Sequence, residues 1–194
     1  MTRPRRPEDW SRDLAGARAS ERDLAKVLSN HSRVHSLRDH TDAFNSLDFS
    51  LDFEGERVFV DMKEKRQTYS RGIANMWSVV PPANLFVLDE TVYRRIVWQG
   101  GGGYLVVRDH PEKRWAIFGP WELTLGPTVR YQRWGERHGQ KFLKGKILLN
   151  LGAAAILAEQ FSVDDLLRVI QDSRAGVKSV AAIATKEQSI PEIG

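Results

Sequence analysis

Residues 46–67, SLDFSLDFEGERVFVDMKEKRQ, contain two runs of alternating apolar and polar residues on either side of Glu54-Gly55. Strict alternation over this length is typical of strands that are buried on one face. We therefore expect antiparallel strands over 47–53 and 57–63, joined by a tight turn at Glu54-Gly55. A symmetric turn would place Asp48 directly opposite Asp61 across the hairpin.

Carboxylates and a lysine share one face of this expected hairpin. Asp48 and Asp61 would lie roughly 5 Å apart, and Lys63 follows Asp61 on the same face because side chains alternate along a strand. Like charges in opposition cost stability unless a proton, Lys63 or a divalent cation compensates them. Magnesium prefers oxygen ligands and typically uses one or two protein carboxylates. We therefore expect Asp48 and Asp61 to bind a metal; the alternative is an ordinary solvated Asp–Lys pair.

An N-terminal helix is expected over residues 8–30, because apolar residues recur there at steps of three and four: Trp10, Leu14, Ala17, Leu24 and Leu28. Glu21 stands in this stripe where an apolar residue would be expected. It would face inward, where it can supply a further metal ligand. A shorter helix with Ser20 as its N-cap is the competing interpretation.

The remaining pattern predicts an α/β fold, a mixed sheet with flanking helices. Residues 31–45 read as a polar connection and 66–84 as irregular. Further elements are expected as strands at 85–88, 104–108 and 115–118 (the last at an edge), a helix at 91–98 and a turn at 100–103.

After about residue 139 the pattern predicts helices. One is expected over 141–160, where the small residues Gly152 to Ala155 allow close packing within the chain or in a homodimer. A capping box at Ser162–Asp165 starts a second helix that would end near Gly176. The expected organisation is an α/β core over 1–125, a basic aromatic segment with C-terminal helices over 126–185, and a tail over 186–194.

Residues 129–146, VRYQRWGERHGQKFLKGK, concentrate the positive charge of a chain whose formal net charge is +4. Cations that contact phosphates give sequence-independent affinity for nucleic acid, and aromatic faces stack on exposed bases. The alternative is that the aromatic residues simply pack and the cations lie in water. We predict a nucleic-acid-binding surface made of Arg130, Arg133, Trp134, Arg137, Lys141, Lys144 and Lys146.

Composition excludes several site classes. The chain has no cysteine, which rules out disulfides, cysteine-ligated zinc and thiol nucleophiles and is typical of a reducing compartment such as the cytoplasm. No apolar run approaches the length of a membrane span, and the basic N-terminus lacks the apolar stretch of a secretory signal. We expect a cytoplasmic protein with no membrane partner.

The order of these features resembles the PD-(D/E)xK nuclease superfamily over about residues 8–108. The stretch LDFSLDFEGERVFVDMKEK is similar to its motif, with Asp48 as the first acid, Asp61 as the second and Lys63 as the lysine. Glu21 matches an acid that some members carry on the first helix. Two departures are Leu47 in place of the usual proline and Asp61 in place of the commoner glutamate.

The resemblance implies a restriction-endonuclease-like fold with the core order helix, three strands, helix, strand. It also implies an endonuclease, of restriction or junction-resolving type, that hydrolyses DNA phosphodiester bonds. The implied cofactor is Mg²⁺, for which Mn²⁺ would substitute. RNA is the alternative substrate. Asp48, Asp61 and Glu21 would hold the metal while Lys63 orients water. The main alternative is a non-catalytic DNA-binding or scaffold module on an inactive nuclease fold, because fold alone does not assign activity.

Overall fold

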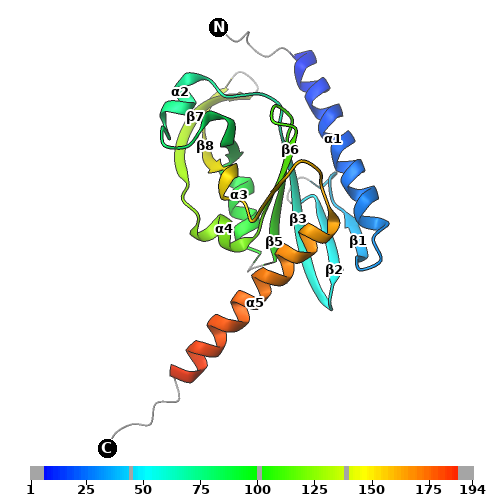
Figure 1. Ribbon diagram of the computed structural model, residues 1–194. Coiled ribbons are helices and arrows are strands. Elements are labelled where there is room, and N and C mark those ends of the chain that lie inside the picture. Colours follow the sequence, from blue (N-terminus) through cyan, green and yellow to red (C-terminus); the bar gives the residue numbers. More distant parts are fainter. Residues whose placement is uncertain (1–6, 44–45, 100–101, 138–139, 188–194) are drawn as a thin grey trace, which may run out of the picture.

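The computed structural model describes residues 7–43, 46–99, 102–137 and 140–187, with side chains described between 18 and 176 except at 44–45, 100–101 and 136–139 (Figure 1). It is an α/β fold with a six-stranded mixed sheet, in the order β1-β2-β3-β5-β6-β9, and a three-stranded sheet, in the order β4-β8-β7. The helices are α1 (Pro7–Ser29), α2 (Arg71–Asn75), α3 (Glu90–Val97), α4 (Pro120–Leu125) and α5 (Val163–Glu187). The strands are β1 (His35–Asp39), β2 (Phe49–Phe53), β3 (Glu56–Lys65), β4 (Leu85–Asp89), β5 (Gly103–Asp109), β6 (Arg114–Phe118), β7 (Val129–Arg137), β8 (Gln140–Asn150) and β9 (Ile156–Ala158).

The β2–β3 hairpin has the predicted register. Glu54 and Gly55 both adopt positive φ, 52° and 81°, which is the geometry of a type I′ turn and matches the right-handed twist of the strands it joins. Phe53 pairs with Glu56, and Phe49 pairs with Val60. The next pair along the hairpin is therefore Asp48 and Asp61.

Hydrophobic cores cover both faces of the large sheet. Val60 and Met62 of β3 point into the core under α1 and α5. Phe59 of β3 and Leu105 of β5 point into the other core, which the second sheet and α3 complete. Since side chains alternate along β3, Asp61 and Lys63 lie on the face that the second sheet covers.

The N-terminal helix is the longer of the two that the sequence allowed. α1 runs from Pro7 to Ser29, and Leu24 and Leu28 are buried in the core as the apolar stripe predicts. Ser20 lies inside the helix and does not cap it; its hydroxyl donates a hydrogen bond to Glu64 Oε1. Trp10, Leu14 and Ala17 lie outside the described side chains.

Several strand predictions need correction. β1 lies in the segment that was expected to be a polar connection. As an exposed edge strand, its sequence HSLRD carries no apolar alternation that could have predicted it. The strand expected at an edge, 115–118, pairs with β5 on one side and β9 on the other. The predicted helix at 91–98 is confirmed as α3, and 85–88 is strand β4 of the second sheet.

The expected helix over 141–160 is wrong. Residues 140–150 form β8, which pairs with β4 and β7, and Ile147, Leu148 and Leu149 are buried as in a strand covered on both faces. Leu151–Ala153 form a single 3-10 turn before β9, so the helix whose small residues were expected to allow close packing, within the chain or in a homodimer, does not form. A glycine at position 145 also disfavours a helix interior.

The C-terminal helix starts where the capping box predicts and ends later. α5 begins at Val163, and the Asp165 N–H donates to Ser162 Oγ at 3.4 Å. It continues through Gly176 to Glu187. Across the expected boundary at 125/126, β8 pairs with β4 and β9 pairs with β6. Of the predicted tail, 188–194 lie outside the described residues.

Within the described part of the chain, no helix combines the length and the apolar composition that a membrane crossing requires.

Candidate active site

Asp48 and Asp61 converge on the amine of Lys63. Lys63 Nζ lies 3.1 Å from Asp48 Oδ2 and 2.8 Å from Asp61 Oδ2, and it also donates to the Met62 carbonyl at 2.8 Å. The Met62 N–H donates to Asp48 Oδ2 at 2.8 Å, which fixes that carboxylate at the entry to β2. The hairpin register therefore assembles the predicted Asp–Asp–Lys group on one face of the sheet.

Asp61 is held in an unfavourable environment. Its side chain is 3 % exposed, against 15 % for Asp48 and 29 % for Lys63. Although Lys63 Nζ is close, it does not lie in hydrogen-bonding geometry with Asp61 Oδ2, and this buried oxygen accepts no hydrogen bond from the described residues. Burial, with Asp48 adding to it and Lys63 opposing it, raises the pKa of Asp61 from 3.8 to about 6. A strained carboxyl of this kind is typical of functional sites.

Lys63 keeps its proton. Burial lowers its pKa, but the carboxylates of Asp61 and Asp48 outweigh burial, so the pKa of Lys63 is raised. A lysine in this state donates hydrogen bonds and supplies positive charge, and it does not act as a base.

Glu21 on α1 lies within electrostatic range of this group, but Glu21, Asp48 and Asp61 do not form a cluster of three acids that could hold a metal. Its pKa is raised first by partial burial and then by the nearby charge of Asp48, while Lys63 lowers it and Asp39 and Asp61 raise it further. The apolar stripe of α1 predicted that Glu21 faces inward, and its side chain is partly buried; its role as a metal ligand stays a prediction. All four residues that the sequence nominated as catalytic lie in one electrostatic neighbourhood.

A neighbouring polar pair was not predicted. Ser50 is buried on the Asp48 face of β2, and its hydroxyl lies 2.8 Å from His40 Nε2. The His40 N–H donates to the Asp48 carbonyl at 2.8 Å. The alternation of β2 placed Ser50 on this face, but nothing in the spacing of His40 signalled its position, because the missed strand β1 brings it there.

The described carboxylates of the site are those of Asp48 and Asp61, and the Lys63 amine lies against both. The described residues contain no cluster of three or more histidine or acidic side chains close enough to hold a metal. Magnesium commonly takes only one or two carboxylates and completes its shell with water and phosphate oxygens. Asp61 Oδ2, buried without a hydrogen-bond donor, is the oxygen that such an ion would satisfy.

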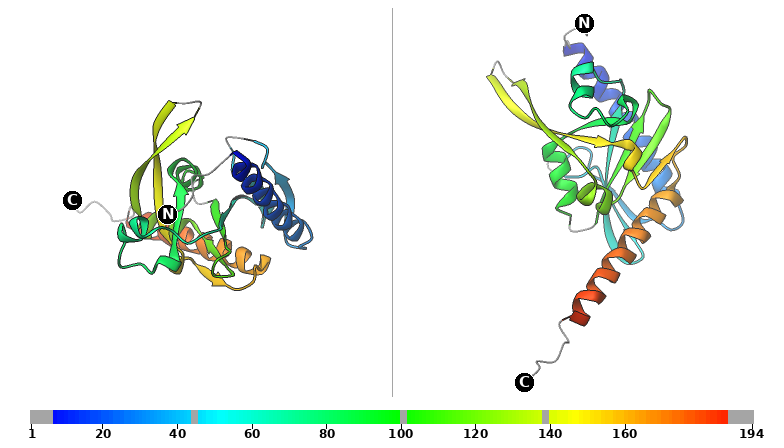
Figure 2. Two further views of the ribbon diagram at one scale, coloured as in Figure 1. Left: turned by 90° about the horizontal axis from the view of Figure 1, so that it is seen from above. Right: turned by 60° about the vertical axis from the view of Figure 1, so that its left-hand side comes forward.

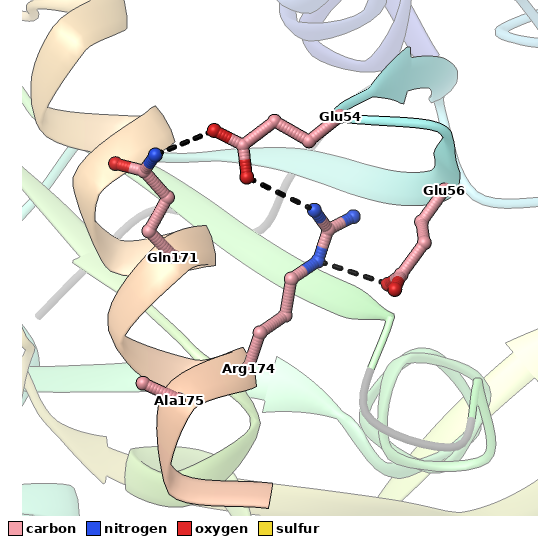
Figure 3. A pocket seen from close by; sticks show the side chains of 5 residues that line it. All are labelled: Glu54, Glu56, Gln171, Arg174 and Ala175. Atoms are coloured by element: carbon pink, nitrogen blue, oxygen red, sulfur yellow. Dashed lines mark hydrogen bonds and ion pairs between the residues drawn. The ribbon is translucent and has the colours of Figure 1, made fainter. Parts of the chain in front are cut away.

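A polar cavity lies away from this site. One of about 250 Å³ lies between the β2–β3 turn and α5 and is lined by Glu54, Glu56, Gln171, Arg174 and Ala175 (Figure 3). Figure 3 shows these polar side chains bound to one another: Gln171 donates to Glu54, and Arg174 pairs with both glutamates. We interpret this cavity as the seam that ties α5 to the turn, because its polar groups already have partners.

The basic aromatic segment forms the β7–β8 hairpin, which projects from the body of the molecule (Figure 2). At its base, Lys144 and Lys146 pair with Asp89, and Arg130 Nη1 lies 3.9 Å from Glu90 Oε1. Because these acids are distant in sequence from residues 129–146, the charges within that segment alone overstated the positive charge that is available to a partner. The other predicted contacts that the structure describes, Arg133, Trp134 and Lys141, are exposed, whereas the Arg137 side chain lies outside the described set.

The stability of the metal-free protein should fall as pH rises through about 6. Because the folded state binds the Asp61 proton more tightly than the unfolded chain, this stabilisation is complete below about pH 4 and is lost above the folded pKa of about 6. Asp61→Asn removes the titration, so with chelator present it should raise the free energy of unfolding at pH 7.5 by up to about 3 kcal/mol. Urea unfolding of both proteins at pH 4.5 and 7.5 measures this; a gain that is equal at both pH values would contradict the account.

Comparison with protein-family models gives no match, and a search of curated proteins gives none either.

Proposed function

We propose that the protein is a magnesium-dependent endonuclease that hydrolyses DNA phosphodiester bonds at the Asp48–Asp61–Lys63 site. The convergence of two carboxylates on one lysine, with the Asp61 side chain almost fully buried, carries this proposal. Replacing that strained group by an amide is expected to stabilise the fold, which suggests that the charge is kept for function.

The arrangement of elements supports the restriction-endonuclease-like interpretation. α1 precedes the antiparallel strands β1, β2 and β3, and the chain then crosses through α3 to β5, which pairs parallel to β3. The large sheet thus has the order helix, three strands, helix, strand once α2 and β4, which lie between β3 and α3, are set aside. The third strand is β1, because the strand expected in that role, 85–88, lies in the second sheet. The acids lie on β3 and at the start of β2, and Glu21 lies on the first helix, as that interpretation requires.

Each residue has a distinct role in the proposed reaction. Asp48 and Asp61 would hold Mg²⁺, or Mn²⁺ in its place, with Glu21 positioned to hold a coordinated water. The ion supplies Lewis-acid polarisation of the scissile phosphate. Protonated Lys63 would orient the attacking water by donating a hydrogen bond and would stabilise the negative charge that develops on the phosphate. Cations of the β7–β8 hairpin would bind the DNA backbone.

A non-catalytic DNA-binding module is the second candidate. It is favoured by the absence of a third clustered acid among the described side chains and by the nearly complete burial of Asp61. In such a module the Lys63 amine would itself be the permanent counter-ion of both carboxylates. DNA binding would then survive without any metal-dependent cutting.

Cleavage assays distinguish these functions. Purified protein should cut labelled DNA with Mg²⁺ or Mn²⁺ and lose this activity completely in EDTA. The substrates should include linear duplex, single strand, flap and four-way junction, each with an RNA counterpart. Metal-independent binding without cleavage of any substrate would reject the nuclease and support the module.

A further inference from the structure

The outer part of the β7–β8 hairpin is a two-stranded arm. β4 pairs with β8 only from Lys146 to Asn150, so the described residues 132–137 and 140–145 have no third strand paired beside them. Figure 2 shows this arm leaving the body of the molecule, and Figure 1 places its free end at the end of the molecule opposite the β2–β3 turn. We call residues 132–137 and 140–145 the arm.

The faces of the arm differ in how their large side chains are used. On one face the Phe142 ring packs against Gly135, where a Cβ atom would lie 2.9 Å from the ring, so Phe142 is engaged with its own hairpin. On the other face Trp134 and Leu143 form a direct cross-strand pair. Trp134 is 66 % exposed and Leu143 is 50 % exposed. A large exposed apolar pair at the end of a projecting hairpin indicates a binding surface.

The charged residues near the Trp134–Leu143 pair indicate the class of partner that would bind there. The acids Asp89 and Glu90 pair with cations at the base of the hairpin. Farther out, Lys141 is exposed and shares the face of Trp134 and Leu143, because side chains alternate along each strand, whereas Arg133 shares the other face with Phe142. An exposed aromatic ring with an exposed lysine on the same face matches a nucleotide with an accessible base, whose ring stacks while its phosphate meets the lysine. A paired duplex offers its bases only as groove edges, so it would leave the Trp134 ring without a partner.

We propose that the Trp134–Leu143 face of the arm stacks on unpaired bases, which makes DNA containing a single-stranded segment, such as a fork or a branch, the preferred substrate. The inference rests on the proposed function for its choice of DNA, and it names the substrate class of that site. Lys141 on the same face binds the backbone of that strand.

The test measures binding alone, with Asp61→Asn protein in EDTA, so that cutting plays no part. Fluorescence anisotropy compares a blunt duplex, a single strand and a fork of equal length. Trp134→Ala should weaken binding of the single strand and the fork by about tenfold or more, because stacking on one aromatic side chain contributes this much per base. Trp134→Phe should retain most of the affinity, and duplex binding should change little.

Trp98 provides a matched control, because it is 74 % exposed on a different element, the end of α3. Trp98→Ala should leave all affinities unchanged. Equal loss on duplex and fork, no loss on either, or no DNA binding by the parent protein would each overturn the inference. This test is independent of the test for nuclease activity. Trp134→Ala can selectively weaken binding of unpaired DNA even if no substrate is cut, and DNA can be cut even if Trp134→Ala has no effect on binding.

Discussion

Asp61→Asn should abolish metal-dependent DNA cleavage, with a rate at least about 10³-fold below that of the wild type, while DNA affinity is retained. The expected loss is large because an electrostatic group aimed at developing charge contributes about 10²–10³ by itself, and Asp61 would also anchor the ion. The affinity should survive because the phosphate contacts lie on the β7–β8 hairpin. Single-turnover cleavage and anisotropy on the same substrate measure the two quantities.

The variant also separates chemistry from folding. Since Asp61→Asn is expected to stabilise the metal-free protein at neutral pH, lost activity could not be attributed to unfolding. Asp52→Asn is the matched control, because Asp52 lies on the same face of the hairpin but pairs with Arg57 away from the site. It should cut at the wild-type rate. Undiminished cleavage by purified Asp61→Asn protein would rule out the proposed site.

Asp109→Ala should destabilise the protein by about 3–5 kcal/mol, because it leaves buried cations without their counter-ion. Asp109 and Lys65 have no exposed side-chain surface, and Asp109 Oδ2 lies 3.3 Å from Lys65 Nζ and 2.9 Å from Arg114 Nε. Burial lowers the pKa of Lys65, and Asp109 opposes that shift. The free energy of unfolding, from urea titrations at pH 7.5, measures the loss.

Two comparisons make this prediction specific. Asp52→Ala removes an ion pair that is open to solvent and should cost far less than Asp109→Ala. Combining Lys65→Met with Asp109→Leu should cost much less than the sum of the single changes, because an apolar pair replaces the buried charges. An Asp109→Ala cost as small as that of Asp52→Ala would contradict the buried-charge account.

This cluster matters to the site because it fixes the strand that carries it. Lys65 follows Lys63 on the same face of β3 and pairs in register with Asp109 of β5. Arg114 adds hydrogen bonds to the Ala83 carbonyl and to Asn84 Oδ1, at 2.9 and 2.8 Å. The cluster therefore joins β3, β5, β6 and the segment before β4, and it holds the end of β3 next to Asp61.

The features that sequence predicted correctly depend on local chemistry. Glu54-Gly55 and the alternation around it determine the hairpin register, and that register brings Asp48, Asp61 and Lys63 together. Glu21 follows from the periodicity of α1 alone. Each of these inferences needs only residues that are neighbours in the chain or on one helix face.

The errors concern long-range pairing. Residues 140–150 carry apolar residues at spacings that a helix also allows, and only the distant partner β4 selects the strand. The same distance concealed Asp89 and Glu90 as partners of Lys144, Lys146 and Arg130. β1 was missed because an exposed edge strand needs no apolar pattern, and His40 was missed with it.

Calorimetric titration of the metal-free protein with Mg²⁺ and Mn²⁺ tests most directly whether Asp48 and Asp61 capture an ion. We predict saturable binding by the wild-type protein and by Asp52→Asn, and loss of binding by Asp48→Asn and by Asp61→Asn. Wild-type protein that binds neither ion, with or without DNA present, or variants that bind as tightly as wild type, would contradict the account.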